Sequence, residues 1–497
     1  MTDTTTVPAR LDRLPWSRFH TRLVVALGVT WVLDGLEITI AGAIGPRLQE
    51  SVTLGISAAQ LGFAASVYLF GEVLGALFFG RLADRVGRRR LFLVTLLIYL
   101  AGSGLTAASL DYWMFIGFRF IAGFGIGGEY AAINSAIDEL IPAKHRGRVD
   151  LSINGTYWLG AVIGSLATSL MLDTSLFGVD VGWRLALLIG PLIALFILPL
   201  RRALPESPRW LIGAGRVEEA ERFVDDIEQQ VVSSGATLGP IDPELATRVA
   251  VRERVRYRYI ARLMLREYPT RTVLGLVLGI SQSFLYNAVF FSYTLVLTTF
   301  YGVSTSATPQ FLFIFAIGNL LGPLLLGRYF DSIGRRPMIA GTYASSGALL
   351  ILTGWLFEQD LLTAGTQTAL WTVIFFIGSA AASSAYLTVS EVFPVAIRAQ
   401  AIAFFFAIWQ LVGGVAAPWI FGSLIGTGDR SALFVGYLIG GVLMIIAGIT
   451  EWVLGVEAAG RPLEAISSAD DGGSRRRSSV VLVRGTGIPP RNTTEHP

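Results

Sequence analysis

Twelve apolar runs, each close to the length that crosses a lipid bilayer, constrain this chain more than any other feature of its sequence. A helix needs about 20 apolar residues to span the hydrocarbon core. The runs lie at residues 23–45, 59–80, 91–109, 112–134, 151–172, 183–200, 272–297, 309–327, 338–357, 368–390, 400–422 and 431–454. None of them alternates polar and apolar side chains over about ten residues, as membrane β-strands do. The sequence therefore predicts an all-α membrane protein with twelve transmembrane helices.

The composition excludes several other classes of protein. Charged residues make up only 15% of the chain, whereas soluble domains carry about 25%. Cysteine is absent, which excludes disulfides and thiolate metal sites. The single lysine, Lys144, is followed by His145, so the chain has no GxxxxGK phosphate loop. We therefore expect no metal and no cofactor, and no ATP bound through such a loop.

The distribution of basic residues predicts the orientation in the membrane. All but four of the 39 basic residues fall on the termini and on alternate connections between the runs. Because cytoplasmic loops are rich in arginine and lysine, both termini are predicted to be cytoplasmic. The net charge of +3 then reflects this topology, and no nucleic-acid partner is indicated. The predicted regions are an N-terminal segment (1–22), an N-terminal six-helix bundle (23–200), a central loop (201–271), a C-terminal six-helix bundle (272–454) and a disordered tail (455–497).

An internal repeat divides the chain into two halves. Residues 71–91 (GEVLGALFFGRLADRVGRRRL) and 318–338 (GNLLGPLLLGRYFDSIGRRPM) match at a fixed offset, which pairs Glu72 with Asn319. A second match follows further along, where the Glu139–Arg146 segment corresponds to Glu391–Arg398. Many secondary transporters are built from such repeats, with the substrate site between the halves near the bilayer midplane. The repeat therefore predicts two pseudo-symmetric six-helix bundles.

The motifs of these halves resemble those of the major facilitator superfamily, in its sugar porter and metabolite:proton symporter branch. Residues 80–90 (GRLADRVGRRR), 118–129 (FRFIAGFGIGGE) and 205–211 (PESPRWL) carry the resemblance. It implies a transporter rather than an enzyme, and a cytoplasmic gate between the halves. The residues assigned to this gate are Gly80, Asp84, Arg88, Arg89, Glu139, Arg146, Asp331, Arg335, Arg336, Glu391 and Arg398. The run 123–128 matches GxGxxG, but within an apolar span its glycines favour close helix packing over dinucleotide binding.

The charged residues that lie well inside the predicted spans are Asp34, Glu37, Glu72, Arg119 and Glu129. Charges within a membrane are costly and usually functional. We assign all five to proton coupling, with Arg119 tuning Asp34 or Glu37, two acids that share one helix face because they are three residues apart. The alternative is a static buried pair that fixes helix packing.

Polar and aromatic residues in other spans predict a hydrogen-bonding pocket. Residues 281–291 (SQSFLYNAVFF) are similar to the seventh-span motif of sugar porters. The residues assigned to substrate binding are Asn154, Tyr157, Trp158, Gln282, Tyr286, Asn287, Tyr386, Trp409 and Gln410. Amides, hydroxyls and aromatic faces suit a sugar-like ligand. Hydrogen bonding between helices is the alternative role for each of them.

These features together predict a proton-coupled symporter of the plasma membrane that takes up a small polar metabolite, a sugar or polyol, as a monomer. The first span keeps a second substrate class open, because Asp34-Gly-Leu-Glu37 resembles the DGxD motif of organic-acid and aromatic-acid symporters. A non-transporting membrane receptor on the same scaffold is the alternative from another class. The predicted partners of the transporter are a small-molecule substrate, protons and the lipid bilayer.

Overall fold

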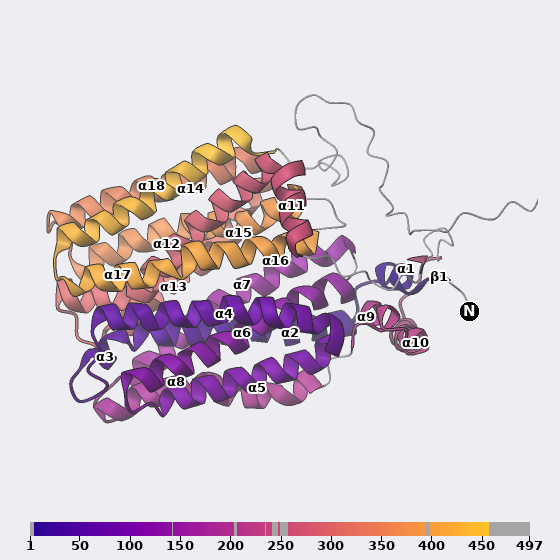
Figure 1. Ribbon diagram of the computed structural model, residues 1–497, viewed down its shortest axis with the longest axis horizontal. Helices are drawn as coiled ribbons and strands as arrows, with labels where there is room; N and C mark the ends of the chain where they lie inside the picture. Colours follow the sequence, from indigo (N-terminus) through magenta and orange to yellow (C-terminus); the bar gives the residue numbers. More distant parts are fainter. Residues whose placement is uncertain are drawn as a thin grey trace, which may run out of the picture.

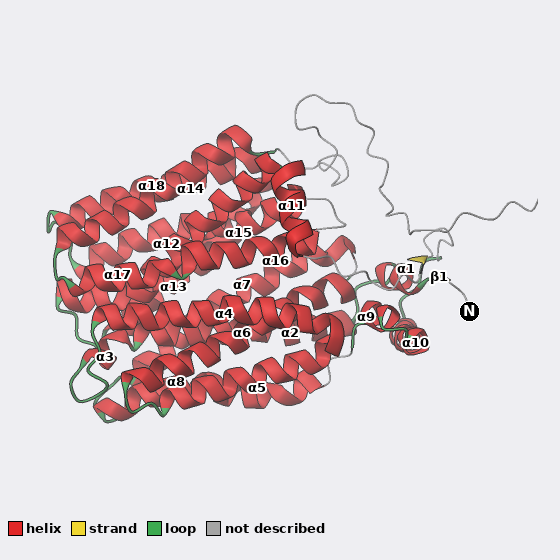
Figure 2. Cartoon of the chain, viewed as in Figure 1, coloured by secondary structure: helices red, strands yellow, loops and turns green. Residues whose placement is uncertain are grey.

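The computed structural model describes residues 4–141, 143–202, 206–233, 235–240, 247–248, 257–392 and 398–456. Within these residues the chain is helical (Figure 2), apart from turns and two short strands. The strands, β1 (Thr4–Thr5) and β2 (Thr247–Arg248), pair antiparallel. In the described part of the chain, nine helices are long and apolar enough to cross a membrane.

Long helices occupy all twelve predicted positions. The N-terminal half contains α2 (Arg18–Ala43), α4 (Ala58–Val86), α5 (Arg88–Ala107), α6 (Tyr112–Leu140), α7 (Ala143–Met171) and α8 (Val179–Arg202). The C-terminal half contains α12 (Pro269–Tyr301), α13 (Thr308–Ser332), α14 (Arg335–Glu358), α15 (Ala364–Val392), α16 (Arg398–Trp409) followed by the π-helical turn η2 (Gln410–Gly414) and α17 (Ala416–Gly426), and α18 (Arg430–Leu454). The predicted all-α fold with two six-helix bundles is confirmed.

Several helices extend past the apolar runs that predicted them. The helix α7 begins at Ala143 and α6 ends at Leu140, whereas the corresponding runs begin at 151 and end at 134. Hydropathy detects only the part of a helix that lies in the hydrocarbon core. The backbone can continue as a helix into the polar region, since its hydrogen bonds are internal.

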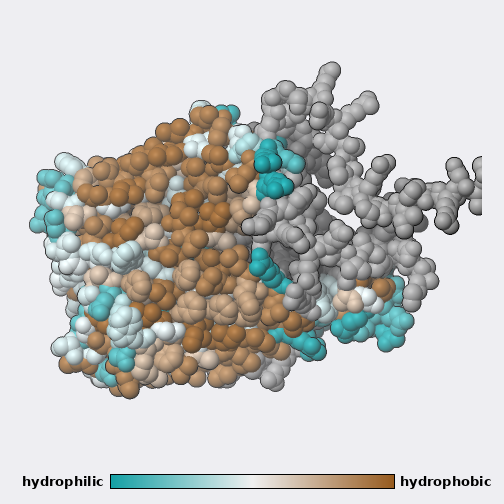
Figure 3. Space-filling view, viewed as in Figure 1, coloured by the Kyte–Doolittle hydropathy of each residue, from teal (hydrophilic) through white to brown (hydrophobic). Residues whose placement is uncertain are grey.

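The two halves form separate bundles that lie side by side (Figure 1). In the N-terminal bundle α4 packs on α6 and α2 on α7, while in the C-terminal bundle α13 packs on α15 and α14 on α18. Apolar side chains cover a broad band of the outer surface (Figure 3), and hydrophilic ones gather at its two ends. We call these the α3 end, after the short helix α3 (Gly45–Gln49), and the α10 end, after α10 (Val217–Ser233).

Glycines allow the helices of each bundle to approach closely. A Cβ added at Gly75 of α4 would lie 2.1 Å from the carbonyl oxygen of Phe124 on α6. At its repeat-equivalent position, Gly322 of α13, an added Cβ would lie 2.1 Å from the carbonyl oxygen of Phe376 on α15. Gly123 and Gly127 of the 123–128 run are similarly close to α4, since a Cβ at Gly123 would lie 2.1 Å from the carbonyl oxygen of Tyr68. They serve close helix packing, as expected.

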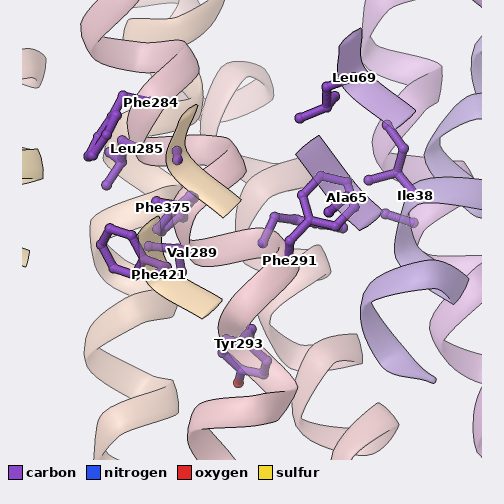
Figure 4. Close-up of a cluster of buried hydrophobic side chains, with 14 of the residues drawn as sticks. Ile38, Ala65, Leu69, Phe284, Leu285, Val289, Phe291, Tyr293, Phe375 and Phe421 are labelled. Atoms are coloured by element: carbon purple, nitrogen blue, oxygen red, sulfur yellow. The ribbon is translucent and has the colours of Figure 1, made fainter. Parts of the chain in front are cut away.

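The halves contact each other near the α3 end. Thr294 Oγ1 of α12 donates a hydrogen bond of 2.6 Å to the carbonyl oxygen of Gly42. A Cβ at Gly62 of α4 would lie 2.2 Å from the carbonyl oxygen of Pro418 on α17. Apolar side chains fill the space behind these contacts, with Ile38 and Ala65 facing Phe291 across the interface (Figure 4). The structure is therefore closed at the α3 end.

The N-terminal segment folds onto the central loop at the α10 end, a contact that the sequence did not predict. The helix α1 (Val7–Asp12) packs with α9 (Pro208–Gly213) and α10 around a small apolar cluster. Arg10 and Arg13 form ion pairs of 2.6 Å each with Glu228 on α10. A further amphipathic helix, α11 (Tyr257–Glu267), precedes α12. The predicted tail lies outside the described residues from position 457 onward.

Candidate functional site

The centre of the N-terminal bundle contains a buried ion pair between α2 and α6. Arg119 Nη1 donates to Glu37 Oε1 over 2.7 Å, and the two side chains are 2% and 0% exposed. Removing two charges from water is expensive unless the pair is well hydrogen-bonded. Of the two partners that the sequence offered for Arg119, the structure pairs it with Glu37.

Hydroxyl groups from α5 complete the surroundings of Glu37. Ser103 Oγ lies 3.1 and 3.0 Å from the two carboxylate oxygens, and Tyr99 donates to Oε2 over 3.2 Å. Gly190 of α8 leaves room for them, because a Cβ there would lie 2.5 Å from the Tyr99 hydroxyl. None of these three residues was predicted from the sequence. The sequence pattern that could have revealed Tyr99 and Ser103 is their four-residue spacing, which places both on one face of an apolar helix.

Asp34 and Tyr68 lie beside this ion pair. The Arg119 guanidinium lies over the Tyr68 ring, 4.1 Å from its centroid, an arrangement that is favourable for a cation. Its Nη2 has no hydrogen-bond partner among the residues that the structure describes. Asp34 is 2% exposed and close enough to Tyr68 and Glu72 to interact with them electrostatically. Gly35, which follows Asp34, allows α7 to approach, since its Cβ would lie 2.0 Å from the carbonyl oxygen of Tyr157.

A third buried acid lies at the interface between the halves. Glu72 of α4 is 1% exposed, and its Oε1 accepts a hydrogen bond of 3.3 Å from Gln410 Nε2 of the C-terminal half. Its Oε2 has no hydrogen-bond partner within the described part of the chain. The fifth predicted charge, Glu129 of α6, is 2% exposed and close enough to Tyr99 for electrostatic interaction. All five predicted intramembrane charges are therefore buried in one bundle.

Gln410 is held in place by α12. Its Oε1 accepts a hydrogen bond of 2.6 Å from Ser283 and a longer one of 3.5 Å from Asn287. Gln410 begins the π-helical turn η2, and such turns are frequent at functional sites. A Cβ at Gly414, in the same turn, would lie 2.7 Å from Gln410 Oε1. The glycine therefore makes the space in which this amide meets α12.

Aromatic residues from both halves lie next to these amides. Trp158 of α7 and Tyr286 of α12 have ring centroids 5.8 Å apart. The Tyr286 hydroxyl donates to Asn319 Oδ1 over 3.2 Å. Gln282 lies one helical turn before Tyr286, hence on the same face of α12, and is half-buried. Of the predicted substrate-binding residues, Tyr157, Trp158, Tyr286, Asn287 and Gln410 are thus gathered at the contact between the bundles.

Two predicted substrate-binding residues lie in a separate cluster. Trp409 is 1% exposed, and its indole N–H donates to the carbonyl oxygen of Gly275 over 2.9 Å. Tyr386 packs against it with ring centroids 5.1 Å apart. Adjacent residues on a helix point about 100° apart, which is why Trp409 and Gln410 face different neighbours.

The predicted cytoplasmic gate is described only in part. Arg336 donates to the carbonyl oxygen of Trp452 and lies over its ring, while Arg89 is exposed. Gly87 and Gly334, the glycines of the two repeated basic turns, have φ angles of 95° and 115°, which other residues rarely adopt. Gly80 lies within α4 and Arg335 begins α14. The remaining predicted gate side chains and that of Asn154 lie outside the described residues: Asp84, Arg88, Glu139, Arg146, Asp331, Glu391 and Arg398.

Comparison with known proteins agrees with this architecture. Over 92% of its length the chain is 28% identical to a niacin transporter of Acinetobacter baylyi, covering 99% of that protein. Over 83% of its length it is 27% identical to the major myo-inositol transporter of Bacillus subtilis, covering 88% of it. The fold matches a D-xylose–proton symporter with a TM-score of 0.68 and 21% identity, over 89% of this chain and 99% of the other.

A similar match is found to the partially occluded, inward-open xylose transporter of E. coli, with a TM-score of 0.70 and 20% identity over 90% of this chain and all of that one. These relatives are transporters, so the prediction that the chain is not an enzyme is confirmed. Residues 35–469 match the family model described as "Sugar (and other) transporter". With its two bundles, its repeated motifs and this match, the chain belongs to the sugar (and other) transporter family of the major facilitator superfamily.

Proposed function

We propose that this multi-pass membrane transporter is a proton-coupled symporter of a neutral, polar metabolite, a sugar or polyol. The observation that carries this proposal is the fully buried Glu37–Arg119 pair, with Asp34 close by. A carboxyl group that gains and loses a proton while the halves rock would link transport to a proton gradient. We place the protein in the plasma membrane with both termini in the cytoplasm and consider it to act as a monomer.

The balance of buried charge favours a neutral substrate. Four buried acids lie in the described spans of the N-terminal bundle, and the arginine buried among them, Arg119, is already paired with Glu37. An organic anion would meet excess negative charge there and would be repelled. Such electrostatic complementarity between a site and its ligand is a main source of specificity. The amides of Gln410 and Asn287 offer the donors and acceptors that hydroxyl groups need.

An organic or aromatic acid is the second candidate. The Nη2 of Arg119, which has no hydrogen-bond partner in the described part of the chain, could receive a carboxylate, and the rings of Trp158 and Tyr286 could stack on an aromatic ligand. The full-length similarity to a niacin transporter supports this class, and the similarity to an inositol transporter supports the first.

The test is uptake by proteoliposomes that contain the purified protein. Labelled myo-inositol, xylose, nicotinate and nicotinamide are compared with and without an inward proton gradient. We expect a polyol or sugar to accumulate only with the gradient, and Glu37→Gln and Asp34→Asn to abolish accumulation while exchange persists. Accumulation that survives both substitutions would overturn the coupling assignment. Nicotinate accumulation without sugar uptake would favour the second candidate, and binding of a substrate without any flux would favour a receptor.

A further inference from the structure

The two repeat-equivalent residues Glu72 and Asn319 use their polar atoms differently. Asn319 is 0% exposed and bonded within its own half: its Oδ1 accepts from Tyr286, and its Nδ2 donates to the carbonyl oxygen of Phe315 over 3.0 Å. Glu72 is equally buried, but only its Oε1 is bonded, to Gln410 of the other half. Its second oxygen has no hydrogen-bond partner among the described residues.

A buried carboxylate oxygen without a donor is unfavourable, since burial removes the water that would otherwise bond to it. A purely structural role for Glu72 would be served better by an amide, which the other half has at this position. The Gln410 amide that contacts Glu72 is half-buried and also contacts Ser283 and Asn287. The open oxygen of Glu72 is therefore next to the polar groups that the C-terminal half offers at the interface.

The charges around Glu72 restrict what could bind there. Asp34 lies close enough to interact with it electrostatically, and so does the hydroxyl of Tyr157. The arginine that lies beside these groups, Arg119, is occupied by Glu37. A ligand group that carries a hydrogen atom to donate, and no negative charge, fits this environment. A carboxylate would be repelled.

We propose that Glu72 is a specificity-determining residue that accepts a hydrogen bond from a donor group of the substrate. The donor is a hydroxyl or an ammonium group, and the substrate is held beside the contact between the Glu72 carboxylate and the Gln410 amide. Glu72 thereby selects neutral and cationic metabolites over organic anions. This inference rests on the proposed transport function and names the substrate class for it.

Glutamine at position 72 provides a sharp test. It has the same shape, and its Oε1 can still accept from Gln410, but its amide group replaces the open oxygen by a donor. Counterflow in proteoliposomes without a proton gradient would measure half-saturating concentrations for myo-inositol, putrescine and nicotinate. We expect Glu72→Gln to raise the value for myo-inositol or putrescine about tenfold, as for loss of a hydrogen bond to a charged group, and to leave that for nicotinate unchanged or lower. Whichever of the two is transported identifies the donor group as hydroxyl or ammonium.

Two further variants separate specificity from folding. Glu72→Asp keeps the charge on a shorter side chain, so it should weaken affinity but retain the preference against nicotinate. Glu451→Gln alters another buried acid, which lies on α18 at 1% exposure, and should leave all three half-saturating concentrations unchanged. Size-exclusion chromatography of each purified variant checks that it is folded.

The outcomes distinguish this inference from the proposed function. Unchanged affinities in Glu72→Gln, or a wild-type preference for nicotinate, would overturn the role of Glu72 even if proton-driven accumulation is observed. If the wild-type protein shows no proton-driven accumulation but still prefers the uncharged or cationic probe over nicotinate, proton coupling is overturned and the role of Glu72 stands. If the wild-type protein neither binds nor exchanges any of the three probes, both proposals are wrong.

Discussion

The two bundles share their packing but differ in the polar groups that they bury. Glycine-mediated helix contacts recur at equivalent positions, as Gly75 and Gly322 illustrate. The N-terminal bundle buries an ion pair and further acids within its spans, whereas at mid-span the C-terminal bundle presents neutral groups such as Asn319 and Gln410. Its described buried charges, Arg271 and Glu451, lie near helix ends. The repeat thus preserves the scaffold, while the described charges buried at mid-span lie in one half and face neutral polar groups of the other.

Replacing Arg119 by methionine should have the largest effect, because it leaves the Glu37 carboxylate buried without its partner. Breaking a buried ion pair from one side costs about 3–5 kcal/mol. The measurement is thermal or denaturant-induced unfolding of the detergent-purified protein, followed by circular dichroism. The double variant Arg119→Met/Glu37→Gln should recover most of the loss. If the single variant is as stable as the wild type, the buried ion pair of the N-terminal bundle contributes no more to the free energy of unfolding than the neutral groups of the C-terminal bundle.

Alanine at Gly75 or at Gly322 should cost similar amounts, because each added Cβ would lie 2.1 Å from a backbone carbonyl oxygen of the neighbouring helix. Overpacking of this kind costs about 1–3 kcal/mol. Gly327, on the same helix as Gly322, has nothing within 4 Å of an added Cβ. Gly327→Ala is the matched control and should stabilise the protein by up to about 1 kcal/mol through helix propensity. If Gly75→Ala and Gly322→Ala lower the free energy of unfolding by clearly different amounts, the helix packing of the two bundles is not equivalent.

Removal of the Tyr286 hydroxyl tests how much the hydrogen bonds between neutral groups stabilise the C-terminal bundle. Tyr286→Phe deletes a hydrogen bond to Asn319 and should cost about 1 kcal/mol. The same unfolding assay measures it against Arg119→Met. A loss as large as that of the arginine variant would show that neutral and charged networks contribute equally, and the distinction between the halves would no longer hold.

The smallest expected effect concerns a charge cluster outside the membrane, where the N-terminal segment meets the central loop. Burial alone would raise the pKa of Glu228, but hydrogen bonds from Arg10 and Arg13 outweigh it and lower the pKa below its ordinary value of 4.5. The stabilisation from Glu228 is therefore present above pH 4.5 and is lost as the pH falls through the lower pKa of the folded state.

Cysteine is absent from the chain, so spin labels on cysteines introduced at Thr6 and Ser233 would attach only there. In the protein that carries only these two cysteines, the distribution of distances between the labels should broaden reversibly below pH 4.5. Glu228→Gln should show a broad distribution at every pH. A distance that does not depend on pH in the parent would exclude these ion pairs as the contact that holds α1 on α10.

The sequence predicted much of the fold because its signals are local or repeated. Apolar runs predicted the positions of the long helices, and the offset between the halves predicted two related bundles. The candidate site was predicted less completely. The five charges predicted inside the spans are all buried, but Tyr99, Ser103 and Gly190 were missed, because a lone serine or glycine in an apolar helix has many structural roles. Helix ends were also missed, since α7 begins in the polar sequence at Ala143.

The sequence by itself determined that the chain spans a membrane, that it is built as a repeat and that a few acids lie within its spans. Each of these follows from the composition of short segments and from the cost of burying charge in lipid. Only the tertiary structure decided that Arg119 pairs with Glu37 and that Glu72 meets Gln410 of the other half. Those contacts join residues far apart in the chain, and they depend on how close the helices approach and how each is rotated about its axis, which hydropathy and spacing do not encode.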